Sequence, residues 1–122
     1  MLKITVVSGI LLLTFSFTAL ALNPNEKEGE KLFKKHCTQC HGLTGEANTR
    51  IAKMLSTPPA NFDDPNYKDS RGKKLAAYTD EELANKIKYG SKGTAMPSFK
   101  ATLSDEQIKY LVDYVRSFKN KK

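Results

Sequence analysis

The sequence predicts an all-α domain of three to four helices. Residues 25–40 and 108–118 carry apolar or small side chains at the i, i+3, i+4, i+7 spacing of one helix face. Capping boxes, in which a Ser or Thr precedes a Glu or Gln by three residues, begin at Thr79 and Ser104 and each precedes an apolar stripe. No long segment alternates apolar and polar residues as a strand does, so a sheet is not expected.

The N-terminus has the features of an export signal. Lys3 is followed by a mostly apolar stretch, and Ala19-Leu20-Ala21 has the small residues of a cleavage site. An uncleaved membrane anchor is the alternative, because the 19 residues 4–22 are just long enough to span a bilayer, but five of them are Ser or Thr. We expect a signal peptide over residues 1–21 and one domain over residues 22–122.

The first expected helix runs over residues 25–40, with Leu32, Phe33 and His36 on one face. Gly29 lies on the same face, where a glycine lowers helix stability. We therefore expect Gly29 to mark a position where another backbone comes close. Gly42 then ends the helix.

A short helix is expected over residues 50–55, with Ile51, Met54 and Leu55 directed inward. The segment 56–62 must be extended, since a residue that precedes proline is excluded from the helical region. Residues 63–76 are polar and are expected to form a loop.

The third helix is expected to begin after the cap at Thr79 and to stop at Gly90. A loop then continues through Thr102. The last helix follows the cap at Ser104. Its buried stripe is expected to consist of Ile108, Leu111, Val112, Val115 and Phe118.

The five residues from Cys37 to His41 read C-T-Q-C-H, which is the attachment signature of haem c. Thiols three residues apart on one helical turn can add to the two vinyl groups of one haem, and the adjacent imidazole can ligate its iron. A thioredoxin-like pair needs a βαβ context, and a structural zinc site needs four well-spread ligands, whereas His36 is the sole further Cys or His. A disulfide between Cys37 and Cys40 in an unloaded exported chain remains open, as does a chance match. One covalent haem c is the expected cofactor.

A six-coordinate iron needs a second axial ligand, for which the candidates are Met54, Met96, His36 and a lysine. His36 adjoins the first cysteine and cannot reach the other face of the ring. Met54 lies on an apolar helical face, where a core methionine is expected. Met96 is preferred, because Pro97 holds it extended and Gly93 permits a turn before it. A thioether is a soft ligand that favours ferrous iron.

Charge is strongly positive. With Lys3 removed, 19 basic and 13 acidic residues leave a net charge of +6, before the haem propionates are counted. Lysines cluster at Lys27, Lys31, Lys34, Lys35, at Lys86, Lys88, Lys92, Lys100, and at Lys119, Lys121, Lys122. Such a surface provides solubility or steers the protein toward a partner with an acidic docking surface. No nucleic acid is expected, because the chain has no recognition motif, and a membrane is expected only if the N-terminal segment is not cleaved.

With the attachment run near its N-terminus and the Ala95-Met96-Pro97 loop, the chain resembles the class I c-type cytochromes, in particular the small soluble monohaem cytochromes c of bacteria. The resemblance covers nearly all of residues 25–118. It implies the cytochrome c fold, in which three to four helices surround one covalently bound haem and the N- and C-terminal helices cross. At that crossing it implies contact of Gly29 and Phe33 with Leu111 and Tyr114.

The chain departs from the family in having no Trp, which in many members lies near a haem propionate. The resemblance leaves Tyr67, Tyr78 or Arg71 as propionate partners. It also implies that a proline carbonyl, of Pro58 or Pro59, accepts a hydrogen bond from the imidazole N–H of the iron ligand.

The function that follows is a periplasmic one-electron carrier, not an enzyme, that passes electrons between respiratory or metabolic redox partners. Cys37 and Cys40 would tether the haem, and His41 and Met96 would ligate its iron. Four lysines would surround the exposed haem edge, namely Lys34, Lys35, Lys92 and Lys100. The alternatives are a haem subunit dedicated to one dehydrogenase or oxidase, and a ligand-binding or peroxidatic haem protein.

Overall fold

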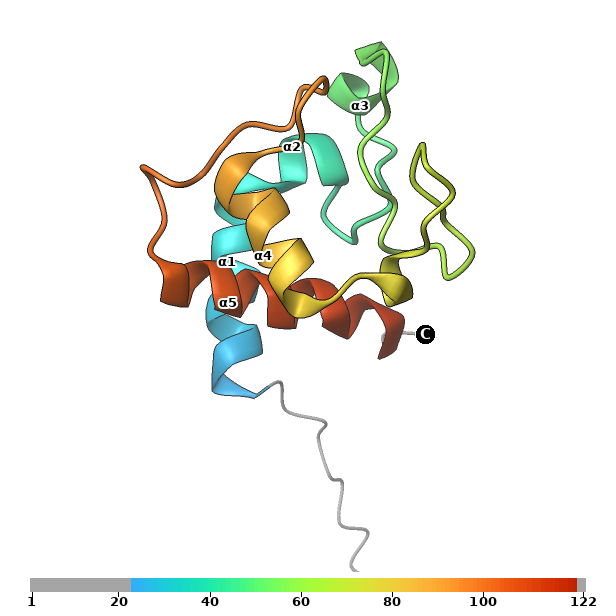
Figure 1. Ribbon diagram of the computed structural model, residues 1–122. Helices are drawn as coiled ribbons and strands as arrows, with labels where there is room; N and C mark the ends of the chain where they lie inside the picture. The colour runs from blue at the N-terminus through green and yellow to red at the C-terminus, as the bar shows by residue number, and fades with distance from the viewer. Residues whose placement is uncertain (1–22, 121–122) are drawn as a thin grey trace, which may run out of the picture.

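The computed structural model of the protein describes residues 23–120 (Figure 1). The predicted signal peptide, residues 1–21, lies outside the described residues. The helices are α1 (Pro24–His36), α2 (Thr38–His41), α3 (Arg50–Met54), α4 (Asp80–Tyr89) and α5 (Asp105–Ser117), with 3-10 turns η1 (Leu75–Ala77) and η2 (Phe118–Asn120). Within residues 23–120 the sole β contact is an isolated bridge between Lys68 and Lys74, which agrees with the predicted all-α class. Over the same residues no helix combines the length and apolarity needed to cross a bilayer.

The first helix is interrupted at Cys37, where an unbroken helix to Cys40 was predicted. Cys37 has φ −117° and ψ −27°, so the chain turns there before α2 begins. The Thr38 hydroxyl donates to the carbonyl of Lys34 at 2.9 Å, the acceptor that the Thr38 amide would bond in an uninterrupted helix. A local side-chain bond therefore replaces a helical one, which the apolar periodicity cannot reveal.

The terminal helices α1 and α5 cross, as predicted (Figure 1). Phe33 and Leu111 are each 1% exposed at this contact. The rings of Phe33 and Tyr114 pack with centroids 5.3 Å apart. Gly29 is buried against the backbone of Tyr110, which confirms that the glycine marks a position where the backbones of two helices come close.

Of the three residues that were predicted to face inward at α3, Leu55 is half-buried, whereas Ile51 and Met54 are exposed. Met54 is 76% exposed and Ile51 is 39% exposed, whereas Ala52 is 4% exposed. α3 lies beside the equally short α2, and its chain becomes extended at Leu55. A helix of five residues turns one position inward, and here that position holds the small alanine.

Both predicted capping boxes are present. The Thr79 hydroxyl accepts from the amide of Glu82 at 3.1 Å while the Glu82 carboxylate accepts from the amide of Thr79 at 2.8 Å. Ser104 exchanges the same two bonds with Gln107. α4 and α5 therefore start where the sequence predicts, and the predicted stripe of α5 is buried: Ile108, Leu111, Val112, Val115 and, just beyond the helix, Phe118.

Candidate haem-binding site

A cavity of about 520 Å³ lies among the helices and is lined by every residue that the sequence assigned to the site. These residues are Cys37, Cys40, His41, Pro58, Pro59, Tyr67 and Met96. They come from four separate parts of the chain, so the fold brings together what the motif and the resemblance suggested. A volume of this size is ordinary for a cofactor pocket.

The deep wall of the cavity is apolar and is supplied by the same helix faces that form the core. It includes Phe33 of α1, Leu83 and Ile87 of α4, and Leu111, Val112 and Val115 of α5. Phe33 and Leu111 are thus both core residues and cavity walls. A large flat apolar group fits this wall, because it would complete a core that these side chains leave open.

The imidazole of His41 is held in one orientation. Its Nδ1 lies 3.0 Å from the carbonyl oxygen of Ala60, which can only accept, so Nδ1 carries the proton and Nε2 keeps its lone pair. The ring stacks on Phe62 with centroids 4.7 Å apart and planes inclined by 16°. Burial lowers the pKa of His41, partly offset by the bond to Ala60, and this favours the neutral form that binds metals.

The carbonyl that contacts His41 corrects one expectation, since it belongs to Ala60 and not to Pro58 or Pro59. The two prolines line the cavity and keep the segment extended. A backbone hydrogen bond holds the end of this extended segment against an earlier loop, because the amide of Phe62 donates to the carbonyl of Gly45 at 2.8 Å. The prolines therefore set the path, and the next residue supplies the acceptor.

Cys37 lies directly before the short helix α2, and Cys40 lies within it. Both cysteines are half-buried. The carbonyl of Cys37 accepts from the amides of Cys40 at 3.3 Å and His41 at 2.9 Å. This one turn directs both thiols and the imidazole toward the same cavity. Burial, with a smaller contribution from Cys40, raises the pKa of Cys37 to about 12.

Met96 lies in a segment that the end of α4 holds in place. Its amide donates to the hydroxyl of Thr94 at 3.2 Å, and its carbonyl accepts from the amide of Ser91 at 3.3 Å. Gly90, at φ 77°, leaves no room for a side chain, since a Cβ there would lie 2.8 Å from the Met96 carbonyl oxygen. Gly93, also at positive φ, makes a second turn. The rival candidate Met54 is exposed on α3.

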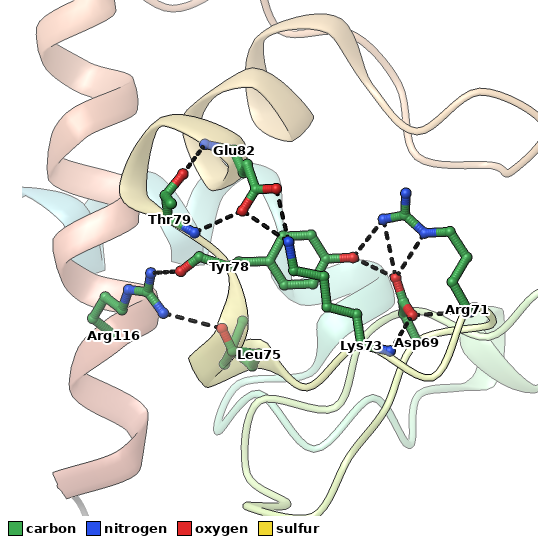
Figure 2. Close-up of polar contacts among 8 residues, drawn as sticks. All are labelled: Asp69, Arg71, Lys73, Leu75, Tyr78, Thr79, Glu82 and Arg116. Carbon is green, nitrogen blue, oxygen red and sulfur yellow. Dashed lines mark hydrogen bonds and ion pairs between the residues drawn. The ribbon is translucent and has the colours of Figure 1, made fainter.

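A polar network forms another part of the cavity wall (Figure 2). The Tyr78 hydroxyl donates to the carboxylate of Asp69 and accepts from Arg71 Nη2 at 2.7 Å. Arg71 also donates to Asp69 from Nε and Nη2, both at 3.2 Å. The bond from Tyr78, followed by bonds from the backbone of Lys73 and from Arg71, holds the pKa of Asp69 well below its usual range. Figure 2 also shows Lys73 bonded to the Glu82 carboxylate.

Two features of this wall were not found from the sequence. Asp69 accepts from the amides of Arg71 and Lys73 at 2.9 and 2.8 Å, an arrangement that the Asp-x-x-Gly spacing to Gly72 could have suggested. The cationic residues that line the cavity are Arg71, Lys73, Lys86 and Lys92. Of the four lysines expected at the haem edge, Lys92 alone is among the described lining residues.

Comparison with known proteins agrees with this site. A sequence profile of the family described as cytochrome C oxidase, cbb3-type, subunit III matches residues 24–115. Cytochrome c6 of Nostoc sp. (strain PCC 7120 / SAG 25.82 / UTEX 2576) is 31% identical over 110 residues, which cover 90% of this chain and 86% of that protein.

Solved structures give the same fold. A chain of the Kuenenia stuttgartiensis reducing HAO-like protein complex Kustc0457/Kustc0458 superposes with a TM-score of 0.64 at 29% identity, over 75% of this chain and 41% of that chain. The KustC0563 c-type cytochrome superposes with a TM-score of 0.59 at 32% identity, over 74% of this chain and 95% of that chain. The attachment motif, the cavity and these relatives agree, and the chain belongs to the c-type cytochrome family, whose haem c is bound covalently.

Proposed function

We propose that the protein is a periplasmic one-electron carrier with one haem c, tethered by Cys37 and Cys40 and ligated by His41 and Met96. The observation that carries the proposal is the hydrogen bond from His41 Nδ1 to Ala60. It leaves Nε2 as the ligating nitrogen of a buried imidazole in a cavity that Met96 also lines. When bound, the haem supplies a ferric–ferrous couple.

The chain's own residues suit electron transfer better than substrate chemistry. With His41 and Met96 both holding the iron, no coordination position would remain for a substrate, and the thioether of Met96 would favour the ferrous state and raise the reduction potential above that of bis-histidine ligation. Phe33, Leu111 and Val112 form an apolar wall of the cavity, and such a wall would limit the access of water to a bound haem. The relative from Nostoc, a cytochrome c6, supports a carrier and not an enzyme.

The proposed partners are redox proteins with an acidic docking surface. Arg71, Lys73, Lys86 and Lys92 line the cavity beside a single described acidic lining residue, Asp69. Arg71 and Lys73 are ion-paired with Asp69 and Glu82, so Lys86 and Lys92 supply the excess positive charge, which attracts an acidic partner over a distance of about 10 Å at moderate salt. The periplasmic location rests on the predicted export signal over residues 1–21.

A subunit dedicated to one larger enzyme is a second candidate. It is favoured by the relative from the reducing HAO-like complex, of whose chain this protein spans 41%. Purification at high salt separates the two cases, since a freely diffusing carrier comes away from its partners and a dedicated subunit stays with one of them.

The test is the visible spectrum of haem-loaded protein, oxidised and reduced, in the wild type and two methionine variants. We expect sharp ferrous bands and the weak far-red ferric band of iron–methionine bonding in the wild type. Met96→Leu should lose the far-red band, whereas Met54→Leu, at an exposed position, should keep it. A high-spin wild-type spectrum, or rapid binding of CO to the ferrous protein, would favour ligand-binding or peroxidatic chemistry instead.

A further inference from the structure

Two segments of the chain, residues 83–104 and 114–122, each carry four basic residues and no acidic one, and the first of them lies within the described helices and loops. The basic residues of this first segment are Lys86, Lys88, Lys92 and Lys100. Lys88 is paired with Asp105 at 2.6 Å, but within residues 23–120 none of the other three makes an ion pair. Residues 22–122 carry a net charge of +6, to which residues 83–104 contribute four positive charges.

The lysine cluster of α1 is different, because its charge is compensated within the helix. α1 holds three glutamates among its four lysines. Lys31 pairs with Glu28 at 2.6 Å, and Lys34 pairs with Glu30 at 2.8 Å. This helix therefore contributes little to the field that an approaching partner senses.

Tyr89, at the end of α4, is the large aromatic side chain exposed within residues 83–104. It is 57% exposed. The ammonium groups of Lys88 and Lys100 lie 5.8 and 5.7 Å from its ring centroid. Exposed tyrosines among cationic side chains are typical anchors of protein interfaces, because the ring buries apolar area with little loss of side-chain freedom.

A shallow groove of about 360 Å³ lies beside Tyr89 and joins it to the haem cavity. Asn85 and Lys86 line it from α4, and Arg71 lines it from the facing loop. Arg71, Lys86 and Gly90 also line the haem cavity. Glu82 also lines the groove, but its carboxylate is bonded to Lys73 Nζ at 2.7 and 2.9 Å. The ammonium group of Lys86 and the amide of Asn85 offer donors next to the ring of Tyr89, which suits a carboxylate side chain adjacent to an apolar one.

We propose that an acidic redox partner docks on the surface formed by Asn85, Lys86, Tyr89, Lys92 and Lys100, here called the Tyr89 face, with Tyr89 as its apolar anchor. The proposal rests on the proposed carrier function, since it says where electrons leave or enter. A partner seated there touches residues that also line the haem cavity, which gives a short path. The lysines of α1 take no part in this docking.

The test measures binding separately from electron transfer. The probe is a synthetic peptide of four glutamates flanking one phenylalanine, added to isotope-labelled, haem-loaded ferrous protein at low salt. We expect amide chemical-shift changes confined to residues 83–104 and Arg71. The affinity for the peptide should fall about tenfold in the triple variant Lys86→Gln/Lys92→Gln/Lys100→Gln. It should fall less than about twofold in the control Lys31→Gln/Lys34→Gln/Lys35→Gln, which loses the same charge.

The role of Tyr89 is tested at constant charge. Tyr89→Ala should lower the affinity for the peptide about fivefold, while Tyr89→Phe should bind the peptide as the wild type does. Equal loss in both triple-lysine variants, shifts centred on α1, or no effect of Tyr89→Ala would overturn the proposal. The visible spectra of the same samples report the proposed function independently, because a high-spin spectrum together with binding at the Tyr89 face would reject the carrier and keep the docking surface.

Discussion

Gly29 of α1 lies directly against the backbone of Tyr110 in α5, so that a Cβ at position 29 would stand 2.0 Å from the Tyr110 carbonyl oxygen. The two helices approach so closely because Gly29 has no side chain, so that the backbone of Tyr110 and the Cβ of Tyr114 lie directly against it. The contact has a consequence for the haem site, since the same two helices carry Phe33 and Leu111 into the cavity wall. The helix crossing and the cavity shape are therefore coupled.

The first prediction concerns this crossing. In an ordinary helix, replacing Gly by Ala stabilises by about 1 kcal/mol, but here Gly29→Ala should lower the free energy of unfolding by about 1–3 kcal/mol through overpacking. Gly29→Val should lower it further. Denaturant unfolding of haem-loaded protein measures the effect, with Lys27→Ala on the exposed side of α1 as control. An unchanged transition midpoint for Gly29→Val would show that the two helices do not meet as described.

The second prediction concerns Arg116, which ties the turn before α4 to α5 (Figure 2). Its guanidinium donates to the carbonyls of Leu75, at 3.1 Å, and Tyr78, and to the carboxylate of Asp80 at 2.9 Å. Arg116→Lys keeps the charge but loses the fork of donors, so unfolding free energy should fall by about 1–3 kcal/mol. Thermal melting of Arg116→Lys checks this, with Lys109→Ala at an exposed position of α5 as the control variant. Equal midpoints for both variants would mean that the fork contributes nothing.

The local features of this fold could be predicted from the sequence because their causes are local. The caps at Thr79 and Ser104 depend on residues three positions apart, and the stripe of α5 depends on a periodicity carried by 13 helical residues. The preference for Met96 as iron ligand, which stays a prediction, likewise rested on a local signal, its neighbour Pro97. Each of these signals lies within a single helix or its immediate flanks.

The features that were missed depend on how distant segments align. Nothing local distinguishes the carbonyl of Ala60 from that of Pro59 as the partner of His41, because the choice follows from the register of an extended segment 19 residues away. Asp69 joins Tyr78 across a loop. In α3, five residues give too short a period to show that Ala52, and not Met54, faces inward.

The third prediction concerns Asp69 and pH. Hydrogen bonds from Tyr78, the backbone and Arg71 hold its pKa below the ordinary value of about 3.9. The charged carboxylate therefore stabilises the fold fully above about pH 4, and this contribution is lost as pH falls further toward the lowered pKa. Asp69→Asn should be less stable than the wild type at pH 7, and the difference should shrink below about pH 4.

Urea unfolding at several pH values between neutral and acidic measures this difference. Asp64→Asn, exposed in the same loop, is the matched control for the same change of side chain and charge. A gap between Asp69→Asn and the wild type that stays constant down to acidic pH would mean that the carboxylate charge is not what the network stabilises.

The fourth prediction is that the haem-free chain does not fold cooperatively. The apolar part of the haem cavity wall, which includes Phe33, Leu83 and Leu111, loses its packing partner when the haem is absent. A typical domain has a stability of only about 5–15 kcal/mol to offset such a loss. Cys37→Ser/Cys40→Ser, which cannot attach haem covalently, should therefore show broad thermal melting and little near-ultraviolet circular dichroism, while the haem-loaded wild type melts sharply. A sharp, native-like transition in the haem-free variant would mean that α1, α4 and α5 close the core without the cofactor.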